Sequence, residues 1–482
     1  MTNSMLLNYA YIKLTQKRRD LKDMGNEAAA KKKDSLEVFR DAPIWQAVLK
    51  NALPAMAAML MTLIYNLADT FFIGQTDNAL MVAAVSLATP VFLIFMGLGN
   101  IFGVGGTSVI SRAMGEDKKE YAKKVCSFCL WSCVIFGVAL EIIFFVFMDQ
   151  ILSFAGASAD TWTYAKQYLS IVSLAGPFVL ISHCYANILR AEGRAGLAMI
   201  GTFAGNLLNV ILDPILILAC GWNVIGAAVA TAVSNFLSAL YYLTYFKWGK
   251  SMLSIRPKDF SAKMGIAKNV FAIGVPAAMG SFLMSISNIL ENGQMSKYGD
   301  MAVAGIGVAL KITMITGMLC IGFGQGVQPL LGYCVGAKNW KRYKKSLRFS
   351  IVFALCIAVF MAAVCYIFIN QIIGAFLSEA DAFDYAVRFS RILLSTSFLF
   401  GVFYVYTNAL QAMGAATGAL IANISRQGLV YIPGLFILQA VMGINGLVWA
   451  QPVADVISLI LVVVLYLIAV RRRSAKDRPD EA

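Results

Sequence analysis

Long runs of apolar residues follow one another along most of the chain, and short polar or glycine-containing segments separate them. Residues 351–369, for example, contain no charged side chain. Such a run is typical of a membrane-spanning helix, which needs about 20 residues, whereas strands of membrane barrels alternate apolar and polar positions. Residues 45–470 have room for about twelve spans. The expected spans begin near Trp45, Met81, Val125, Tyr164, Ala195, Val224, Val270, Val303, Phe349, Tyr385, Gly418 and Gly446.

The composition agrees with a protein that lies in lipid. Hydrophobic residues make up 59% of the 482 residues and charged residues only 14%, and the mean hydropathy is +0.71. This leaves too little polar surface to cover a water-soluble globule. The formal net charge of +14 does not indicate a nucleic-acid partner, because the basic residues form short clusters between apolar runs.

The basic residues follow the even-numbered spans and are scarce after the odd-numbered ones. Lys118 and Lys119 follow the second span, for example, and Lys341 and Arg342 follow the eighth. Basic loops stay preferentially in the cytoplasm. The pattern therefore predicts a multi-pass protein of the inner (cytoplasmic) cell membrane with both termini in the cytoplasm.

The second half of the chain repeats the first. Leu53-Pro54-Ala55 returns as Val275-Pro276-Ala277, an offset of 276 − 54 = 222 residues. Other matches near this offset are Asn66 with Asn288, Asp69 with Glu291, and Asn187 with Asn408. Because six spans separate the copies, both copies have the same orientation, and a pseudo-two-fold axis along the membrane normal relates them. Two bundles that face a central cleft are the expected packing.

These patterns predict an all-α integral membrane protein with twelve transmembrane helices in two pseudo-symmetric six-helix lobes. The expected segments are a cytoplasmic tail (1–42), an N-lobe (43–248), a cytoplasmic linker (249–268), a C-lobe (269–471) and a second tail (472–482).

Ionisable and polar groups inside the first-half spans are candidates for function, because a charge in a membrane costs about 2.5–3.5 kcal/mol. Asp69 lies late in span one, Asn209 and Asp213 share one face of span five, and Thr231 lies in span six. Pro214 lacks an amide proton and interrupts the helix after Asp213. Two carboxylates, an amide oxygen and a hydroxyl can bind Na⁺, or the carboxylates can bind a proton. The alternative is that these groups only join helices by hydrogen bonds.

The second half does not repeat this set of ligands. Its acids are Glu291 in span seven and Asp455 in span twelve, and Lys311 or Arg426 could neutralise them. We therefore expect ion coupling in the first half, whereas Glu291 either attracts substrate or forms a structural ion pair. The residues expected to line the substrate cavity are Asn66, Asn288, Glu291 and Asp455.

Several motifs resemble the multidrug and toxic compound extrusion (MATE) family, most closely its bacterial NorM-, DinF- and MepA-like members. They are Leu53-Pro54-Ala55, the segment Ala68-Asp69-Thr70-Phe71-Phe72-Ile73-Gly74, Leu208-Asn209-Val210-Ile211-Leu212-Asp213-Pro214, and Arg426-Gln427-Gly428. The resemblance covers roughly residues 45–470 and implies a two-lobed antiporter driven by Na⁺ or H⁺. It also implies a cation site at Asp69, Asn209, Asp213 and Thr231, with Glu291 at the acidic position of span seven. The acid that some members carry in span ten is replaced here by Asn408 and Gln411.

We expect secondary active efflux of cationic or amphipathic drugs or metabolites by alternating access of two lobes. The protein should work as a monomer in lipid, without a cofactor other than the coupling ion. The single histidine, His183, and the lack of a nucleophile motif argue against an enzyme. Two alternatives remain open, a flippase for lipid-linked oligosaccharides and a membrane scaffold that transports nothing.

Overall fold

The structure is a computed structural model that describes residues 36–76, 78–249, 251–263, 265–377 and 379–477. Most of the predicted N-terminal tail, residues 1–35, and the end of the C-terminal tail, residues 478–482, lie outside the described residues. Within the described residues there is no strand. Ten helices there are long and apolar enough to cross a membrane, and two bent helix pairs bring the number to twelve. The predicted fold class is confirmed.

The first six spans form the first lobe. They are α3 (Ile44–Gly74), α4 (Ala79–Gly115), α5 (Lys119–Val146), the bent pair α7 (Ala159–Leu174) and α8 (Gly176–Ala191), α9 (Ala195–Asp213) with the π-helix η1 (Pro214–Ala219), and α10 (Asn223–Trp248). A short helix, α6 (Met148–Phe154), precedes α7, and α2 (Glu37–Arg40) precedes α3.

The last six spans form the second lobe. They are α11 (Ile266–Met295), α12 (Asp300–Gly336), α13 (Trp340–Ile367), the bent pair α15 (Ala380–Ser397) and α16 (Leu399–Met413), the span α17 (Ala416–Ile424), η4 (Ser425–Leu429) and α18 (Tyr431–Met442), and α19 (Ile444–Asp477). The short elements η2 (Pro257–Asp259), η3 (Ser296–Tyr298) and α14 (Ile369–Gly374) lie between spans. The bends are equivalent, since the fourth span bends by 52° in the first lobe and by 46° in the second.

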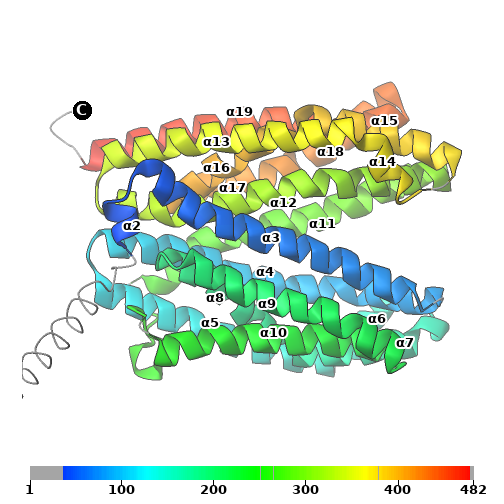
Figure 1. Ribbon diagram of the computed structural model, residues 1–482, viewed down its shortest axis with the longest axis horizontal. Coiled ribbons are helices and arrows are strands. Elements are labelled where there is room, and N and C mark those ends of the chain that lie inside the picture. The colour runs from blue at the N-terminus through cyan, green and yellow to red at the C-terminus, as the bar shows by residue number, and fades with distance from the viewer. Residues whose placement is uncertain (1–35, 77, 250, 264, 378, 478–482) are drawn as a thin grey trace, which may run out of the picture.

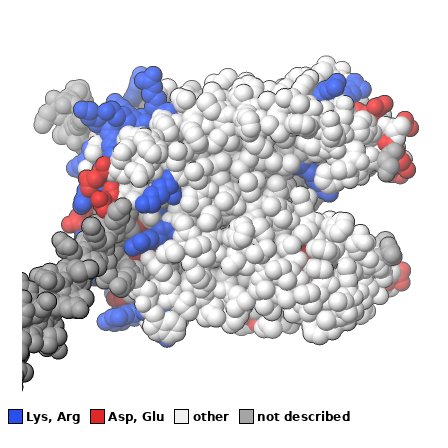
Figure 2. Space-filling view, in the orientation of Figure 1, with Lys and Arg blue, Asp and Glu red and all other residues white. Residues whose placement is uncertain are grey.

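The two lobes meet at one end and separate at the other. The joined end carries most of the basic side chains, and we call it the basic end (Figures 1 and 2). Arg112 near the end of α4, Arg342 near the start of α13 and Arg473 near the end of α19 belong to it. Figure 2 shows a deep cleft between the lobes that opens at the opposite end. Across the interface α3 packs on α12 and α4 packs on α11, so the first two spans of each lobe face the other lobe.

Glycines allow the lobes to approach closely near the basic end. A methyl group added at Gly105 of α4 would lie 2.2 Å from the carbonyl oxygen of Val270 on α11. The equivalent contact between α12 and α3 is also tight, since a methyl group at Gly326 would lie 2.5 Å from the Cα atom of Ala52. The glycines of the second span of each lobe thus serve close helix packing.

Hydrogen bonds between the lobes reinforce the closed basic end. Arg190 of α8 is 3% exposed and donates to Oε1 of Gln325 on α12 at 2.8 Å. Ser108 of α4 donates to the carbonyl oxygen of Gln411 on α16 at 2.5 Å. The side chain of Arg342 on α13 donates to backbone carbonyls of Phe39 and Ala42, at 2.7 Å in both cases, and so attaches the residues before α3 to the second lobe.

A buried carboxylate holds the segment between the lobes. Glu192, directly after α8, accepts hydrogen bonds from the Met252 amide at 2.6 Å and the Ser251 hydroxyl at 2.8 Å. Burial raises the pKa of Glu192 above its ordinary value, and these hydrogen bonds only partly oppose that effect. The linker is therefore fixed against the basic end of the first lobe.

Candidate functional site

The four residues predicted to bind a cation come together in the first lobe. Asp69 lies on α3, Asn209 and Asp213 on α9, and Thr231 on α10. The amide of Asn209, with its nitrogen directed at the carboxylate, donates to Oδ2 of Asp213 at 3.0 Å and accepts from the Thr231 backbone amide at 3.2 Å. This orientation is the physically sensible one, because an ionised carboxylate can only accept. Three helices thus meet at one polar cluster.

The cluster has oxygens available for a cation. Asp213 is fully buried, Asn209 and Thr231 are buried, and Asp69 is half-buried. One carboxylate oxygen of Asp69 and one of Asp213 have no hydrogen-bond partner among the described residues. The two carboxylates lie close enough for their charges to interact. Unpaired carboxylate oxygens in a membrane interior are costly, and a bound cation or proton would remove that cost.

The helix break at Pro214 is also present. The α-helix of span five ends at Asp213, and the π-helix η1 begins at Pro214. Proline removes one backbone hydrogen bond and crowds the preceding turn, which favours such a break. The break places Asp213 at a point where the helix is irregular.

Two tyrosines complete the cluster, and the sequence did not single them out. Tyr65 and Tyr168 both interact with Thr231 through their side chains and with the charges of Asp69 and Asp213. Tyr65 precedes Asp69 by four residues, so the two side chains share one helix face. That spacing could have identified Tyr65, whereas Tyr168 comes from α7 and gives no comparable signal.

The second lobe contains a buried ion pair and does not repeat this cluster. Arg426 of η4 donates to Oδ1 of Asp455 on α19 at 2.7 Å. Gln451 donates to the same oxygen at 2.8 Å and Thr396 to the other oxygen at 3.2 Å. The guanidinium also lies 4.3 Å from the ring centroid of Phe400. Asp455 is 3% exposed and fully satisfied by its own neighbours.

The other residues predicted to line the substrate cavity occupy different environments. Glu291 is 3% exposed beside the hydroxyl of Tyr431, and its Oε1 atom has no hydrogen-bond partner among the described residues. Asn66 and Asn288 are exposed on α3 and α11. The structure therefore does not join these two asparagines to the buried acids in one cluster, and their role in substrate binding stays a prediction.

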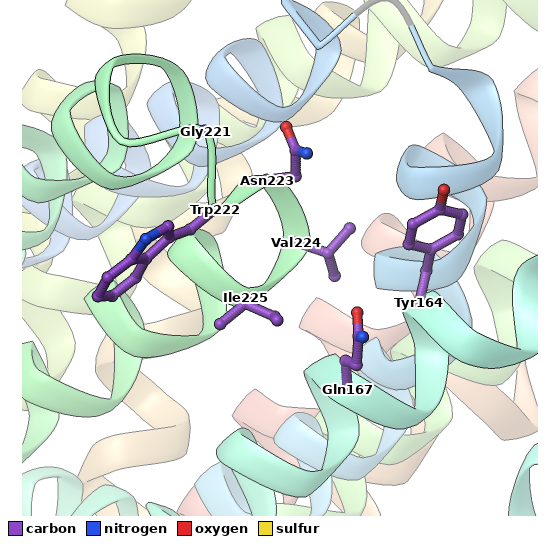
Figure 3. A pocket seen from close by; sticks show the side chains of 7 residues that line it. All are labelled: Tyr164, Gln167, Gly221, Trp222, Asn223, Val224 and Ile225. Atoms are coloured by element: carbon purple, nitrogen blue, oxygen red, sulfur yellow. The ribbon is translucent and has the colours of Figure 1, made fainter.

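A small pocket lies at the end of the first lobe opposite the basic end. Its volume is about 440 Å³, and it lies between α7 and the start of α10. Val224 and Gln167 point into the space beside Tyr164, whereas the ring of Trp222 points away (Figure 3). Tyr164 is one helical turn from Tyr168, which belongs to the polar cluster around Asp69 and Asp213. The pocket walls carry polar groups but no charge.

A model of the MatE family matches this chain twice, over residues 54–215 and 276–437. The chain belongs to the MatE family. Both ends of the two matches differ by 222 residues, since 276 − 54 and 437 − 215 give the same value. Each copy of the MatE repeat begins at the proline of the first span of a lobe and ends in the fifth span.

Relatives match over nearly their whole length. The multidrug export protein MepA of Staphylococcus aureus (strain MSSA476) is 32% identical over 444 residues, which cover 91% of this chain and 97% of MepA. The MepA protein of Staphylococcus haemolyticus (strain JCSC1435) is 32% identical over 454 residues, which cover 93% and 98% of the two chains.

Solved structures share the fold. The chain is similar to a MATE protein crystallised in complex with MaL6, with a TM-score of 0.86 and 25% identity over 92% of this chain and 99% of that one. A multidrug resistance MATE family transporter of the MOP superfamily in an outward-facing conformation also gives a TM-score of 0.86 with 25% identity, and covers 93% and 100%. The resemblance inferred from the sequence motifs is thus confirmed, and the chain is a MatE transporter, not an enzyme.

Proposed function

We propose that this transporter exports cationic or amphipathic small molecules, drugs or metabolites, in exchange for Na⁺ or H⁺. The observation that carries the proposal is the pair of carboxylates, Asp69 and Asp213, each with a buried oxygen that no described residue satisfies. The names of the MepA relatives, which are multidrug export proteins, supply the substrate class.

Coupling requires that the cation and the substrate bind preferentially to different states of the first lobe. A cation that enters the cluster neutralises the repulsion between the two carboxylates and draws α3, α9 and α10 together. Such a change can lower the affinity for substrate, and the effect is reciprocal. An entering monovalent cation gains about 2.3 kcal/mol per 100 mV of membrane potential, which can drive the exchange.

Both candidate ions suit the cluster. Na⁺ prefers oxygen ligands, and the carboxylates of Asp69 and Asp213, the amide oxygen of Asn209 and the hydroxyl of Thr231 are all oxygen donors. A proton needs only one carboxylate, and the second carboxylate nearby would favour its binding. The coupling ion is cargo in either case, so we propose no resident cofactor.

Alternating access follows from the arrangement of the lobes. The cleft opens opposite the basic end (Figure 2), and glycine-mediated contacts close the basic end. We propose that the lobes, residues 43–248 and 269–471, rock about these contacts while the linker 249–268 stays on the basic side. Both lobes belong to one chain, so a monomer in lipid is sufficient.

The basic end should face the cytoplasm of a cell whose inner membrane holds the protein, with both termini on that side. Single cysteines at Lys258 and Lys344 should then react with a membrane-permeant reagent only, whereas a cysteine at Asn78 should react with an impermeant reagent in intact cells. This result is expected because basic loops remain in the cytoplasm. Labelling of Asn78 from the cytoplasmic side would overturn the orientation.

Transport of a cationic dye by purified protein in proteoliposomes tests the function. A Na⁺ gradient and a pH gradient are imposed in separate experiments. We expect one of the two gradients to drive dye transport by the wild type. A flippase would instead move labelled lipid-linked oligosaccharide under the same conditions. A scaffold would move neither molecule and would leave drug tolerance of an efflux-deficient host unchanged.

A further inference from the structure

Lys311 is a charged residue within the transmembrane helix α12, and neither the ion coupling nor the packing of the helices explains it. Its side chain is exposed, and its Nζ atom lies 5.6 Å from the ring centroid of Phe376. Lys311 forms no salt bridge with any residue that the structure describes. An unpaired lysine inside a span is costly, so it is a candidate for binding a ligand of opposite charge.

The helical register places Lys311 on the side of α12 that faces the first lobe. Gln325, on the same helix, contacts Arg190 of the first lobe. Lys311 precedes Gln325 by 14 residues (325 − 311), close to four helical turns, so both lie on nearly the same face. The rise between them is about 21 Å toward the open end, where the lobes have separated.

At that level the face borders the cleft. A methyl group at Gly307, one turn further along the same face, would have no neighbour within 4 Å, which agrees with an open space there. Lys311 is therefore accessible to a molecule in the cleft.

The opposite wall differs in charge. Pro90 of α4 occupies the position that matches Lys311 in the first lobe, and it is exposed and uncharged. The offset between these two spans is 221 residues, because Gly103 contacts Asn187 as Gly324 contacts Asn408. The acid of the first lobe, Asp69, is half-buried on α3. The cleft thus has a cation on the second-lobe wall and an acid within the first lobe. A molecule with a negative group at one end and a cationic, apolar body fits this arrangement.

We propose that Lys311 determines specificity by binding the carboxylate of amphipathic, zwitterionic molecules, an inference that deepens the proposed export function and rests on it. The ammonium group of Lys311 donates a charge-assisted hydrogen bond to the carboxylate. Phe376 offers an aromatic surface beside it. Molecules that lack the carboxylate lose this contact but keep the apolar ones.

Rhodamine B and its ethyl ester test the inference, because they differ only in whether the carboxylate is free. Binding of each dye to purified protein should be measured by fluorescence polarisation, and efflux in proteoliposomes separately. We expect Lys311→Gln to weaken rhodamine B binding about tenfold and ester binding less than twofold, since only the former loses a charge-assisted contact. Lys311→Arg should retain most rhodamine B affinity. Thr89→Gln, beside the matching position Pro90 on α4, is the control in the first lobe.

The outcomes separate this inference from the export function. Equal effects of Lys311→Gln on both dyes, no effect on either, or no binding of rhodamine B to the wild type would overturn the role of Lys311. Lys311-dependent dye selectivity in binding, without gradient-driven efflux by the wild type, would support Lys311 and overturn export. Gradient-driven efflux by the wild type, with a ratio of rhodamine B to ester binding that Lys311→Gln leaves unchanged, would support export and overturn the role of Lys311.

Discussion

Replacing Asp213 by asparagine removes one negative charge from the cation cluster without changing its shape. Asp213 is fully buried and accepts a hydrogen bond from Asn209 at 3.0 Å, and the carbonyl oxygen of an asparagine at 213 can accept the same bond. The volume of the side chain is nearly unchanged, so no cavity forms. We therefore expect Asp213→Asn to fold and insert like the wild type.

The loss should fall on cation binding. Removing one partner of a desolvated charge pair costs about 2–5 kcal/mol, and a central value of about 3 kcal/mol corresponds to roughly a hundredfold weaker cation affinity. Asp213 has no solvent exposure that would screen its charge, so this cost is not reduced by solvent. Gradient-driven efflux should then be abolished, and Asp69→Asn should have the same effect.

Thermal unfolding in nanodiscs measures this loss without transport. A cation at 100 times its Kd stabilises the wild type by about 2.7 kcal/mol, and a hundredfold weaker site leaves only about 0.4 kcal/mol at the same concentration. The midpoint should therefore rise with Na⁺, or with acidification if the ion is H⁺, in the wild type but barely in Asp213→Asn. Asp455→Asn is the matched control, because that acid is already paired with Arg426.

Comparable efflux by Asp213→Asn and wild type, at matched expression, would refute the assignment of this carboxylate. The same holds for a cation-dependent rise in the unfolding midpoint that survives the substitution. Loss of efflux by Asp455→Asn to the same degree as by Asp213→Asn would contradict the expectation that coupling belongs to the first lobe.

Two further predictions concern packing. Arg426→Met leaves the carboxylate of Asp455 buried without its cation and should lower the free energy of unfolding by about 3–5 kcal/mol, measured by thermal or chemical unfolding, whereas an unchanged stability would contradict the structural role of the pair. Gly105→Val places side-chain atoms against the carbonyl oxygen of Val270 and should cost about 1–3 kcal/mol and increase cysteine accessibility at the basic end. Gly307→Val, where nothing lies within 4 Å, is the control and should leave accessibility unchanged.

The sequence alone was sufficient for the number of spans, their approximate starts and the two-copy organisation. Span length and continuous apolarity are local properties imposed by the thickness of the bilayer, so they can be read without tertiary contacts. The repeat is visible because the two copies retain matching prolines and acids at a constant offset. Asn209 and Asp213 were likewise found as a pair, because four residues on one helix always share a face.

Only the tertiary structure decided which distant groups meet. The motifs implied that Asp69 and Asp213 share one site, but nothing in the sequence indicated that Tyr168 would join them from α7 or that Arg426 would select Asp455 over Glu291. These contacts depend on how separate helices rotate about their axes and pack, and side-chain periodicity within one helix leaves that rotation undetermined. The same packing is tight at the glycines of the basic end and leaves the lobes apart at the other end, where α12 carries Lys311.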